Sequence, residues 1–217
     1  GIGSLLKAAG VTVFKGHGAF TGRKTVKVVD GEGGEVEEIT ANKIIIASGS
    51  ETLVPGFIPK GKRVITSTEL LSIPEIPKSL LILGGGVIGC EFACLFAELG
   101  TKVTIVEMLD SIMPNIDRET SRVVAAQMQK MGIEIMNGKP LGDLKADDKG
   151  VSGKVGDLTV SADYLLVSIG RKPALEGMNL AASGVKTNER GWIPVDSSCR
   201  TNVPGIFAIG DATGSWQ

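Results

Sequence analysis

Residues 80–107 read LLILGGGVIGCEFACLFAELGTKVTIVE, and this stretch decides the fold. Its apolar start, Leu80–Leu83, has the length of a buried strand and leads into the glycine turn Gly84–Gly89. The segment Glu91–Leu99 carries apolar residues at helical spacing, and a second strand follows it and ends at Glu107. A strand, a glycine turn, a helix and a strand ending in an acid form the βαβ unit that is typical of dinucleotide binding.

The turn fits the spacing G-x-G-x-x-G, and each of its glycines has a separate physical task. Gly84 permits the tight turn, Gly86 leaves room for a pyrophosphate beside the backbone, and Gly89 lets the helix pack close to the strand. The helix N-terminus at Val87 and Ile88 then offers N–H groups and a positive dipole end to phosphates. The alternative is a tight turn with no ligand and an incidental glutamate, but strand, turn, helix and acid together favour the dinucleotide site.

Glu107 predicts which dinucleotide binds. It stands at the end of the second strand, where a carboxylate would accept hydrogen bonds from the adenosine ribose hydroxyls. Its charge would repel the 2′-phosphate of NADP, and the next residue, Met108, adds no cation to offset that repulsion. The sequence therefore predicts NAD(H) as the ligand.

Composition excludes several other classes of protein. The chain has 217 residues, of which 42% are hydrophobic, and a formal net charge of −1, with no basic stripe for nucleic acid. No apolar run reaches the roughly 20 residues that span a membrane. Three cysteines without framework spacing indicate a reducing compartment, and a single histidine, His17, makes a metal site improbable and is expected to be solvated. We expect a soluble cytoplasmic protein, or one of the mitochondrial matrix if the source is eukaryotic.

The remaining sequence predicts further strands and helices around the βαβ unit. Strands are expected at 11–14, 25–29, 36–39, 43–47, 133–136, 164–169, 192–195 and 206–209, helices at 66–71 and 117–131, and a small β-meander between 141 and 161. The isoleucine-rich strand 43–47 is expected to be buried on both faces, as in a parallel sheet.

Four segments, in this order, closely resemble the flavin-dependent disulfide reductases. They are residues 81–91, 103–107, 168–173 and 201–211. Within this family the sequence is most similar to the branch that oxidises dihydrolipoamide. The resemblance implies an α/β fold in which a Rossmann-like three-layer NAD-binding domain, with a parallel sheet and a β-meander, occupies residues 61–175. It would be inserted between two segments, 1–60 and 176–217, of an FAD-type domain.

The resemblance also assigns roles to individual residues. Ser48 and Gly49 match a strand end beside the flavin, with Ser48 in place of the usual threonine, and Asp211 matches an aspartate that binds the ribityl chain of FAD. Gly170 and Arg171 match the turn where the NAD-binding domain leads back to the FAD-type domain. The alternative for Asp211 is a helix N-cap.

Glu91 matches a glutamate that pairs with a lysine near the flavin, and the alternative is an acid in the first helical turn that complements the helix dipole. The family's first G-x-G-x-x-G, its C-x-x-x-x-C redox pair and its C-terminal interface domain with catalytic His and Glu have no counterpart here. We therefore expect a fragment that binds NAD(H) without turnover and contains no catalytic residue. Cys90 and Cys94, one helical turn apart, are expected to be packing residues, and Cys199 a surface or strand residue.

For the whole protein, the resemblance implies an NAD-dependent flavoprotein oxidoreductase with FAD and NAD as cofactors. Its partners would be a lipoyl-bearing protein of a 2-oxo acid dehydrogenase or glycine cleavage complex and a second copy of itself, with no nucleic acid and no membrane. The alternatives are another flavin disulfide reductase, of the mercuric reductase, glutathione reductase or soluble transhydrogenase type, and a non-catalytic module that binds NADH or flavin.

Overall fold

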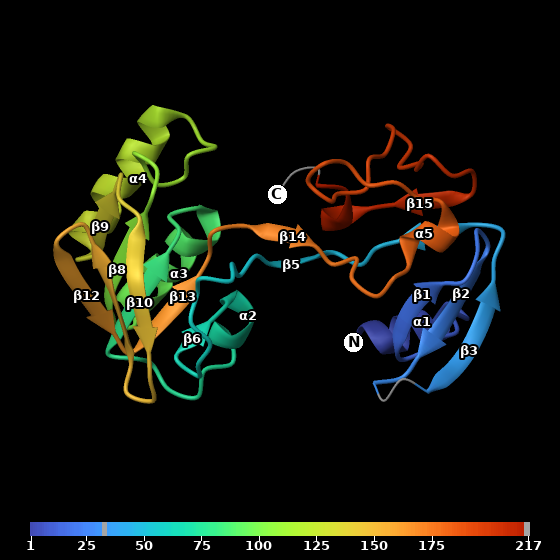
Figure 1. Cartoon of the computed structure of the whole chain (residues 1–217), viewed down its shortest axis with the longest axis horizontal. Coiled ribbons are helices and arrows are strands. Elements are labelled where there is room, and N and C mark those ends of the chain that lie inside the picture. Colours follow the sequence, from blue (N-terminus) through green and yellow to red (C-terminus); the bar gives the residue numbers. More distant parts are fainter. Residues whose placement is uncertain (32–33, 215–217) are drawn as a thin grey trace. The chain divides into compact units, whose positions relative to one another are not determined.

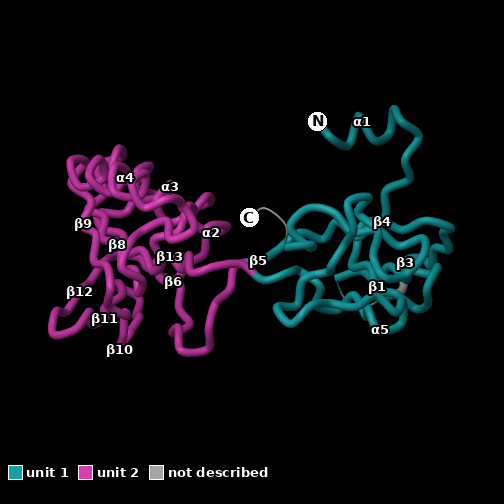
Figure 2. The backbone as a smooth tube through the Cα atoms, turned by 90° about the horizontal axis from the view of Figure 1, so that it is seen from above, with its two compact units in different colours: residues 1–51, 172–217 teal, residues 52–171 magenta. Residues whose placement is uncertain are grey.

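The computed structural model describes residues 1–31 and 34–214, which divide into two compact units (Figure 2). The first unit consists of residues 1–51 and 172–217, and the second is the continuous segment 52–171 inserted into it. The chain passes between them twice, along β5 (Ser50–Thr52) and β14 (Arg171–Pro173), which form a two-stranded sheet. The domain boundaries expected from the sequence, at residues 61 and 175, fall nine and four residues further along the chain than the limits of this segment, residues 52 and 171.

A five-stranded parallel sheet is the centre of the second unit (Figure 1). In spatial order its strands are β6 (Val64–Ile65), β13 (Tyr164–Val167), β7 (Ser79–Leu83), β8 (Lys102–Glu107) and β9 (Glu134–Asn137). All of these except β6 were predicted. Because every neighbouring pair is parallel, the carboxyl ends of the strands meet at one edge of the sheet, where α/β proteins bind ligands.

The sheet is covered on both faces, as the three-layer prediction requires. Leu80 and Ile82 pack in one core with buried side chains of α3 (Val87–Glu98) and α4 (Arg118–Lys130). Leu81 and Leu83, which point the other way, pack in a second core with the antiparallel meander. The meander comprises β10 (Leu141–Ala146), β11 (Val151–Val155) and β12 (Leu158–Ala162). Because successive side chains of a strand point to opposite faces of the sheet, one run of apolar residues contributes to two cores.

The helix N-termini follow from local sequence. α3 begins at Val87, four residues before the segment of helical apolar spacing starts at Glu91, so the end of the glycine motif forms its first turn. α4 is capped by Asp117, whose carboxylate accepts the Thr120 amide at 2.9 Å. The short helix α2 (Ser67–Leu70) has a capping box, in which Thr66 is the N-cap.

The first unit has two small sheets. One is an antiparallel meander of β1 (His17–Phe20), β2 (Thr25–Val29) and β3 (Glu35–Thr40), and the other is the parallel pair of β4 (Ile44–Ile46) and β15 (Ile206–Ala208). A strand from each of the two segments of this unit therefore contributes to one sheet. Two short helices, α1 (Ile2–Ala8) and α5 (Leu180–Ser183), and a 3-10 turn, Gly210–Thr213, complete the described part of this unit.

Three predictions for this unit are wrong. Residues 11–14 form no strand, and Val13 is 59% exposed, because no neighbouring strand takes up their backbone hydrogen bonds in the described structure. Residues 192–195 form no strand either, since the amide of the fully buried Ile193 donates to the Ala212 carbonyl in a loop. β4 is not buried on both faces, because Ile45 is 61% exposed.

Candidate dinucleotide-binding site

The glycine loop lies at the carboxyl edge of the parallel sheet, between β7 and α3. Gly84 has φ of +104°, and a Cβ there would lie 2.6 Å from the Ser168 carbonyl oxygen. A Cβ at Gly89 would lie 2.1 Å from the Gly84 carbonyl oxygen, so only glycine allows α3 to start this close to the strand. A Cβ at Gly86 would meet nothing within 4 Å, so the middle of the loop borders open space.

Hydrogen bonds hold the loop backbone in place. The Gly84 amide donates to the Val106 carbonyl at 2.9 Å, and the Gly85 carbonyl accepts the Met113 amide at 2.7 Å. Helix geometry leaves the amides of the first turn of α3 without acceptors inside the helix, and Val87 in that turn is 49% exposed. The loop therefore presents a preformed set of N–H donors beside the opening at Gly86.

Glu107 is the last residue of β8 and lies beside this loop. One carboxylate oxygen, Oε2, accepts the Gly85 amide at 2.7 Å, and the other, Oε1, accepts the Leu109 amide at 2.8 Å. The residue is buried, with 9% of its surface exposed. Each carboxylate oxygen can accept a further hydrogen bond, so these two contacts orient the group without using its full capacity. The adjacent Met108 is 66% exposed and brings no charge.

The residues expected to bind FAD lie in the first unit, at the ends of two parallel strands. Ser48 and Gly49 follow β4, and Asp211 follows β15. The Asp211 carboxylate accepts a hydrogen bond from the Ser50 hydroxyl at 2.6 Å. Asp211 lies inside the 3-10 turn, whose N-cap is Ile209, so it does not cap that turn. Ser50 was not predicted as its partner, although the parallel pairing of the two strands brings their ends together.

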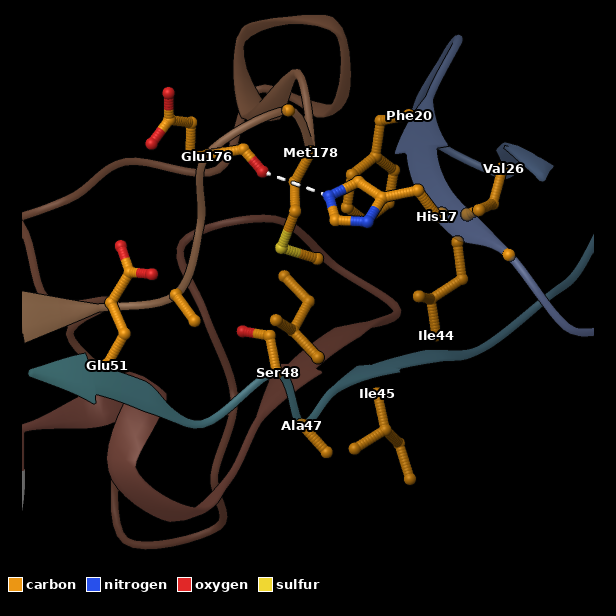
Figure 3. A pocket seen from close by; sticks show the side chains of 15 residues that line it. His17, Phe20, Val26, Ile44, Ile45, Ala47, Ser48, Glu51, Glu176 and Met178 are labelled. Carbon is orange, nitrogen blue, oxygen red and sulfur yellow. Dashed lines mark hydrogen bonds between the residues drawn. The ribbon is translucent and has the colours of Figure 1, made fainter. Parts of the chain in front are cut away.

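A pocket of about 660 Å³ opens beside β4 in this unit (Figure 3). Its lining is mostly apolar and includes Ile44, Ile46 and Met178, with Ser48 and His17 among the polar groups. His17 is exposed, as expected, and its Nε2 atom lies 3.4 Å from the carbonyl oxygen of Glu176. The predicted flavin-side residue Ser48 thus borders a space large enough for part of a cofactor.

The residues where the chain passes between the units make contacts that hold the local backbone and side chains in place. Gly170 has φ of +142°, and its carbonyl accepts the Leu53 amide at 3.0 Å. Arg171 begins β14, and the next residue, Lys172, forms an exposed ion pair with Glu51 at 2.9 Å. The hydrogen bonds of Glu51 and its charge raise the pKa of Lys172.

Glu91 and the cysteines complete the predicted set. Glu91 is exposed and lies beyond the first turn of α3, so it does not complement the helix dipole as the alternative proposed. Cys90, Cys94 and Cys199 are all free thiols. Burial, and to a smaller degree the charges of Cys94, Glu107 and Glu91, raise the pKa of Cys90 to about 12. Burial also raises the pKa of Cys94. Thiols that resist ionisation are poor nucleophiles, which supports a packing role.

The described residues contain no group of three or more His, Cys, Asp or Glu side chains arranged to hold a metal ion. Within the same residues, no helix has the length and apolar character needed to cross a membrane.

The fold and these sites define a class of protein. Residues 1–217 match the pyridine nucleotide-disulphide oxidoreductase family, and the chain belongs to it.

Among its relatives, the chain is 40% identical over 216 residues to the dihydrolipoyl dehydrogenase of Chlamydia pneumoniae, covering 100% of this chain and 46% of that protein. It is 40% identical over 220 residues to the dihydrolipoyl dehydrogenase of Bacillus subtilis, covering 100% of this chain and 47% of that protein. The chain thus spans about half the length of these relatives.

Solved structures, among them a flavoprotein disulfide reductase, also have the fold of this chain. The HOCl-induced flavoprotein disulfide reductase RclA from Escherichia coli superposes with a TM-score of 0.89 at 32% identity, covering 100% of this chain and 50% of that one. LpdA from Mycobacterium tuberculosis gives a TM-score of 0.87 at 27% identity, covering 99% of this chain and 48% of that one.

Proposed function

We propose that residues 52–171 bind NAD(H) and that the chain is the NAD(H)-binding portion of a dihydrolipoyl dehydrogenase. The observation that carries the proposal is the preformed cradle at the start of α3. Space at Gly86 admits a pyrophosphate, and the first-turn amides at Val87, Ile88 and Gly89 supply N–H donors at the positive end of a helix of 12 residues.

Glu107 supports the choice of NAD(H) over NADP(H). Its carboxylate is held beside the loop by two backbone amides and has acceptor capacity left for ribose hydroxyls. A 2′-phosphate at the same place would bring like charges within a few ångströms, at a cost on the order of several kcal/mol. A neutral neighbour, Met108, does not offset this repulsion.

The chain's own residues bind and orient the cofactors. Ser48, Gly49 and Asp211 would hold part of FAD at the ends of β4 and β15, and Gly170 with Arg171 would border the NAD side. Glu91 would support the flavin side. Both cofactors, when bound, supply hydride transfer, which is their chemistry and not that of the polypeptide. The 660 Å³ pocket beside Ser48 is consistent with a bound group there.

The relatives support a proposal for the activity of the whole protein. A dihydrolipoyl dehydrogenase oxidises dihydrolipoamide and reduces NAD⁺, so a lipoyl-bearing protein of a 2-oxo acid dehydrogenase or glycine cleavage complex would be its partner, and the enzyme would form a homodimer in the cytoplasm or mitochondrial matrix. The identities of 40% to two dihydrolipoyl dehydrogenases support this branch of the family.

A second candidate is another flavin disulfide reductase, which the structural similarity to RclA favours. In the coding sequence on either side of residues 1–217, extra C-terminal cysteines would separate the types of reductase, and upstream redox cysteines in the spacing C-x-x-x-x-C would indicate the disulfide chemistry that these reductases share. Their absence would instead favour a non-catalytic NADH-binding or flavin-binding module.

The binding proposal is tested by titrating NADH into the 217-residue chain and following nucleotide fluorescence, with ADP-ribose as competitor. ADP-ribose carries the pyrophosphate and both riboses without the nicotinamide, so it should displace NADH if the cradle at Gly86 is the site. A chain that binds no NADH up to millimolar concentration, or NADH binding that ADP-ribose does not displace, would contradict the proposal.

A further inference from the structure

Ser168 lies where the end of β13 meets the glycine loop. Its amide donates to the Leu83 carbonyl at 2.9 Å and so extends the pairing of β13 with β7. Its hydroxyl oxygen lies 3.1 Å from the Leu83 carbonyl oxygen and 3.0 Å from that of Gly84. Because the Leu83 carbonyl already accepts the Ser168 amide, we assign the hydrogen bond of the Ser168 hydroxyl to the Gly84 carbonyl.

Two glycines of the loop make room for this serine. A Cβ at Gly84 would lie 2.6 Å from the Ser168 carbonyl oxygen, and a Cβ at Gly89 would lie 2.9 Å from the Ser168 hydroxyl oxygen. A side chain at Gly89 would therefore displace the Ser168 hydroxyl, and a side chain at Gly84 would displace the Ser168 backbone.

The Gly84 carbonyl and the Gly85 amide belong to one peptide group, which is planar and rigid. Its oxygen accepts the Ser168 hydroxyl at 3.0 Å, and its N–H donates to Glu107 Oε2 at 2.7 Å. Any rotation of this peptide plane would weaken both hydrogen bonds. Each bond also polarises the peptide in the direction that strengthens the other.

We propose that Ser168 is a positioning residue that acts through the Gly84–Gly85 peptide on Glu107. The hydroxyl holds the peptide at one end, and the peptide fixes the carboxylate at the other. The inference rests on the proposed function, because Glu107 is there the acceptor for the ribose and the group that disfavours NADP(H). Discrimination between the dinucleotides then depends on a hydroxyl at the opposite end of the loop peptide from the acid.

The hydrogen-bonded relay is tested first without nucleotide, in ¹H–¹⁵N spectra of the 217-residue chain. Ser168→Ala and Glu107→Gln should each move the Gly85 amide resonance, since both change the polarisation of the same peptide. Ser152→Ala is the matched control, because Ser152 is a half-buried serine on β11 of the same unit. A Gly85 resonance that is unmoved by Ser168→Ala would overturn the inference.

The effect on binding is tested with NADH and NADPH. Loss of one hydrogen bond corresponds to about a threefold to tenfold change in affinity. Ser168→Ala should weaken the binding of NADH by that factor and the binding of NADPH by less, so the ratio of the two affinities should move towards one. Ser152→Ala should change neither affinity. In a Glu107→Gln background, Ser168→Ala should cause little further loss of NADH affinity, because both substitutions act on the same peptide group. Equal losses for both dinucleotides, or additive effects, would overturn the selective role.

The spectroscopic and the binding experiments also separate this inference from the proposed function. A wild-type chain that binds neither dinucleotide would overturn the proposed function and the selective role of Ser168. A Gly85 resonance that still moves in Ser168→Ala would establish the relay itself in that case.

Discussion

The two units place polar groups at the carboxyl ends of parallel strands in different surroundings. In the second unit the sheet has five strands and is covered on both faces. Its glycine loop is tied to the end of β8, because the Gly84 amide donates to the Val106 carbonyl and the Gly85 amide donates to the Glu107 carboxylate. In the first unit the parallel sheet has two described strands, Ile45 is 61% exposed, and the Asp211 carboxylate accepts the Ser50 hydroxyl.

This difference shows what a dinucleotide site requires beyond a favourable topology. A set of backbone donors on a rigid sheet can hold a pyrophosphate without reorganising, whereas a carboxylate at a strand end offers one or two hydrogen bonds to a polyol. We therefore expect the second unit to bind its nucleotide without help and the first unit to bind flavin weakly.

The largest effect should come from closing the contact between α3 and the strand. In Gly89→Ala the new Cβ would lie 2.1 Å from the Gly84 carbonyl oxygen, which is backbone and cannot move aside cheaply. We expect the free energy of unfolding of the second unit to fall by about 3 kcal/mol or more, and NADH binding to be lost. Urea unfolding followed by circular dichroism, together with NADH titration, measures both.

Gly86→Ala is the matched control and sharpens the contrast. A Cβ at Gly86 meets nothing within 4 Å, and its φ of −68° suits alanine, so stability should change by less than about 1 kcal/mol, the cost of a poorer N-cap. NADH should nevertheless bind at least about tenfold more weakly, because the methyl group would hold the pyrophosphate away from the amides. If Gly86→Ala bound NADH normally, the ligand would not lie over this residue.

The next effect in size is the difference between FAD binding and NADH binding to the wild-type chain. Hydrogen bonds from Asp211 and its neighbours contribute about 1 to 3 kcal/mol to FAD binding, whereas micromolar affinity requires about 8 kcal/mol. FAD should therefore bind the 217-residue chain at least about tenfold more weakly than NADH. Protein purified with stoichiometric yellow flavin would contradict this difference between the units.

The smallest effects concern the cysteines. Cys199 is exposed, whereas Cys90 is buried with its pKa raised to about 12, so a thiol reagent at pH 8 should label Cys199 and leave Cys90 protected in the native protein. Because the ordinary pKa of the thiol is about 9, the unfolded chain loses this proton before the folded one, and stability should fall as the pH rises from about 9 towards 12. Rapid labelling of Cys90, or a Cys90–Cys94 disulfide formed with mild oxidant, would contradict the packing role.

Much of the second unit could be predicted from local sequence. The apolar run Leu80–Leu83, the spacing of the glycines and the strand that ends at Glu107 depend on residues close in the chain, and the structure places them as expected. Contacts between distant segments could not be predicted in this way. Ser168 reaches Gly84 only because β13 pairs beside β7, a pairing that local periodicity does not reveal.

The first unit was predicted less well for a related reason. Residues 11–14 and 192–195 have the apolar composition of strands, but composition specifies a strand only where a neighbour completes its hydrogen bonds. Ile193 satisfies its amide with the Ala212 carbonyl and becomes buried without entering a sheet. Ser50 was likewise missed as the partner of Asp211, because their contact depends on the pairing of β4 with β15.

The most direct test of the central claim is a calorimetric titration of NADH and NADPH into the wild-type chain and Glu107→Ala. Wild type should prefer NADH, and the substitution should weaken NADH by about 1 to 3 kcal/mol while NADPH binds more tightly, with a further gain for NADPH when Met108→Arg supplies a cation. Equal affinities of wild type for the two dinucleotides, or an unchanged ratio in Glu107→Ala, would show that Glu107 is not at the ribose and contradict the account.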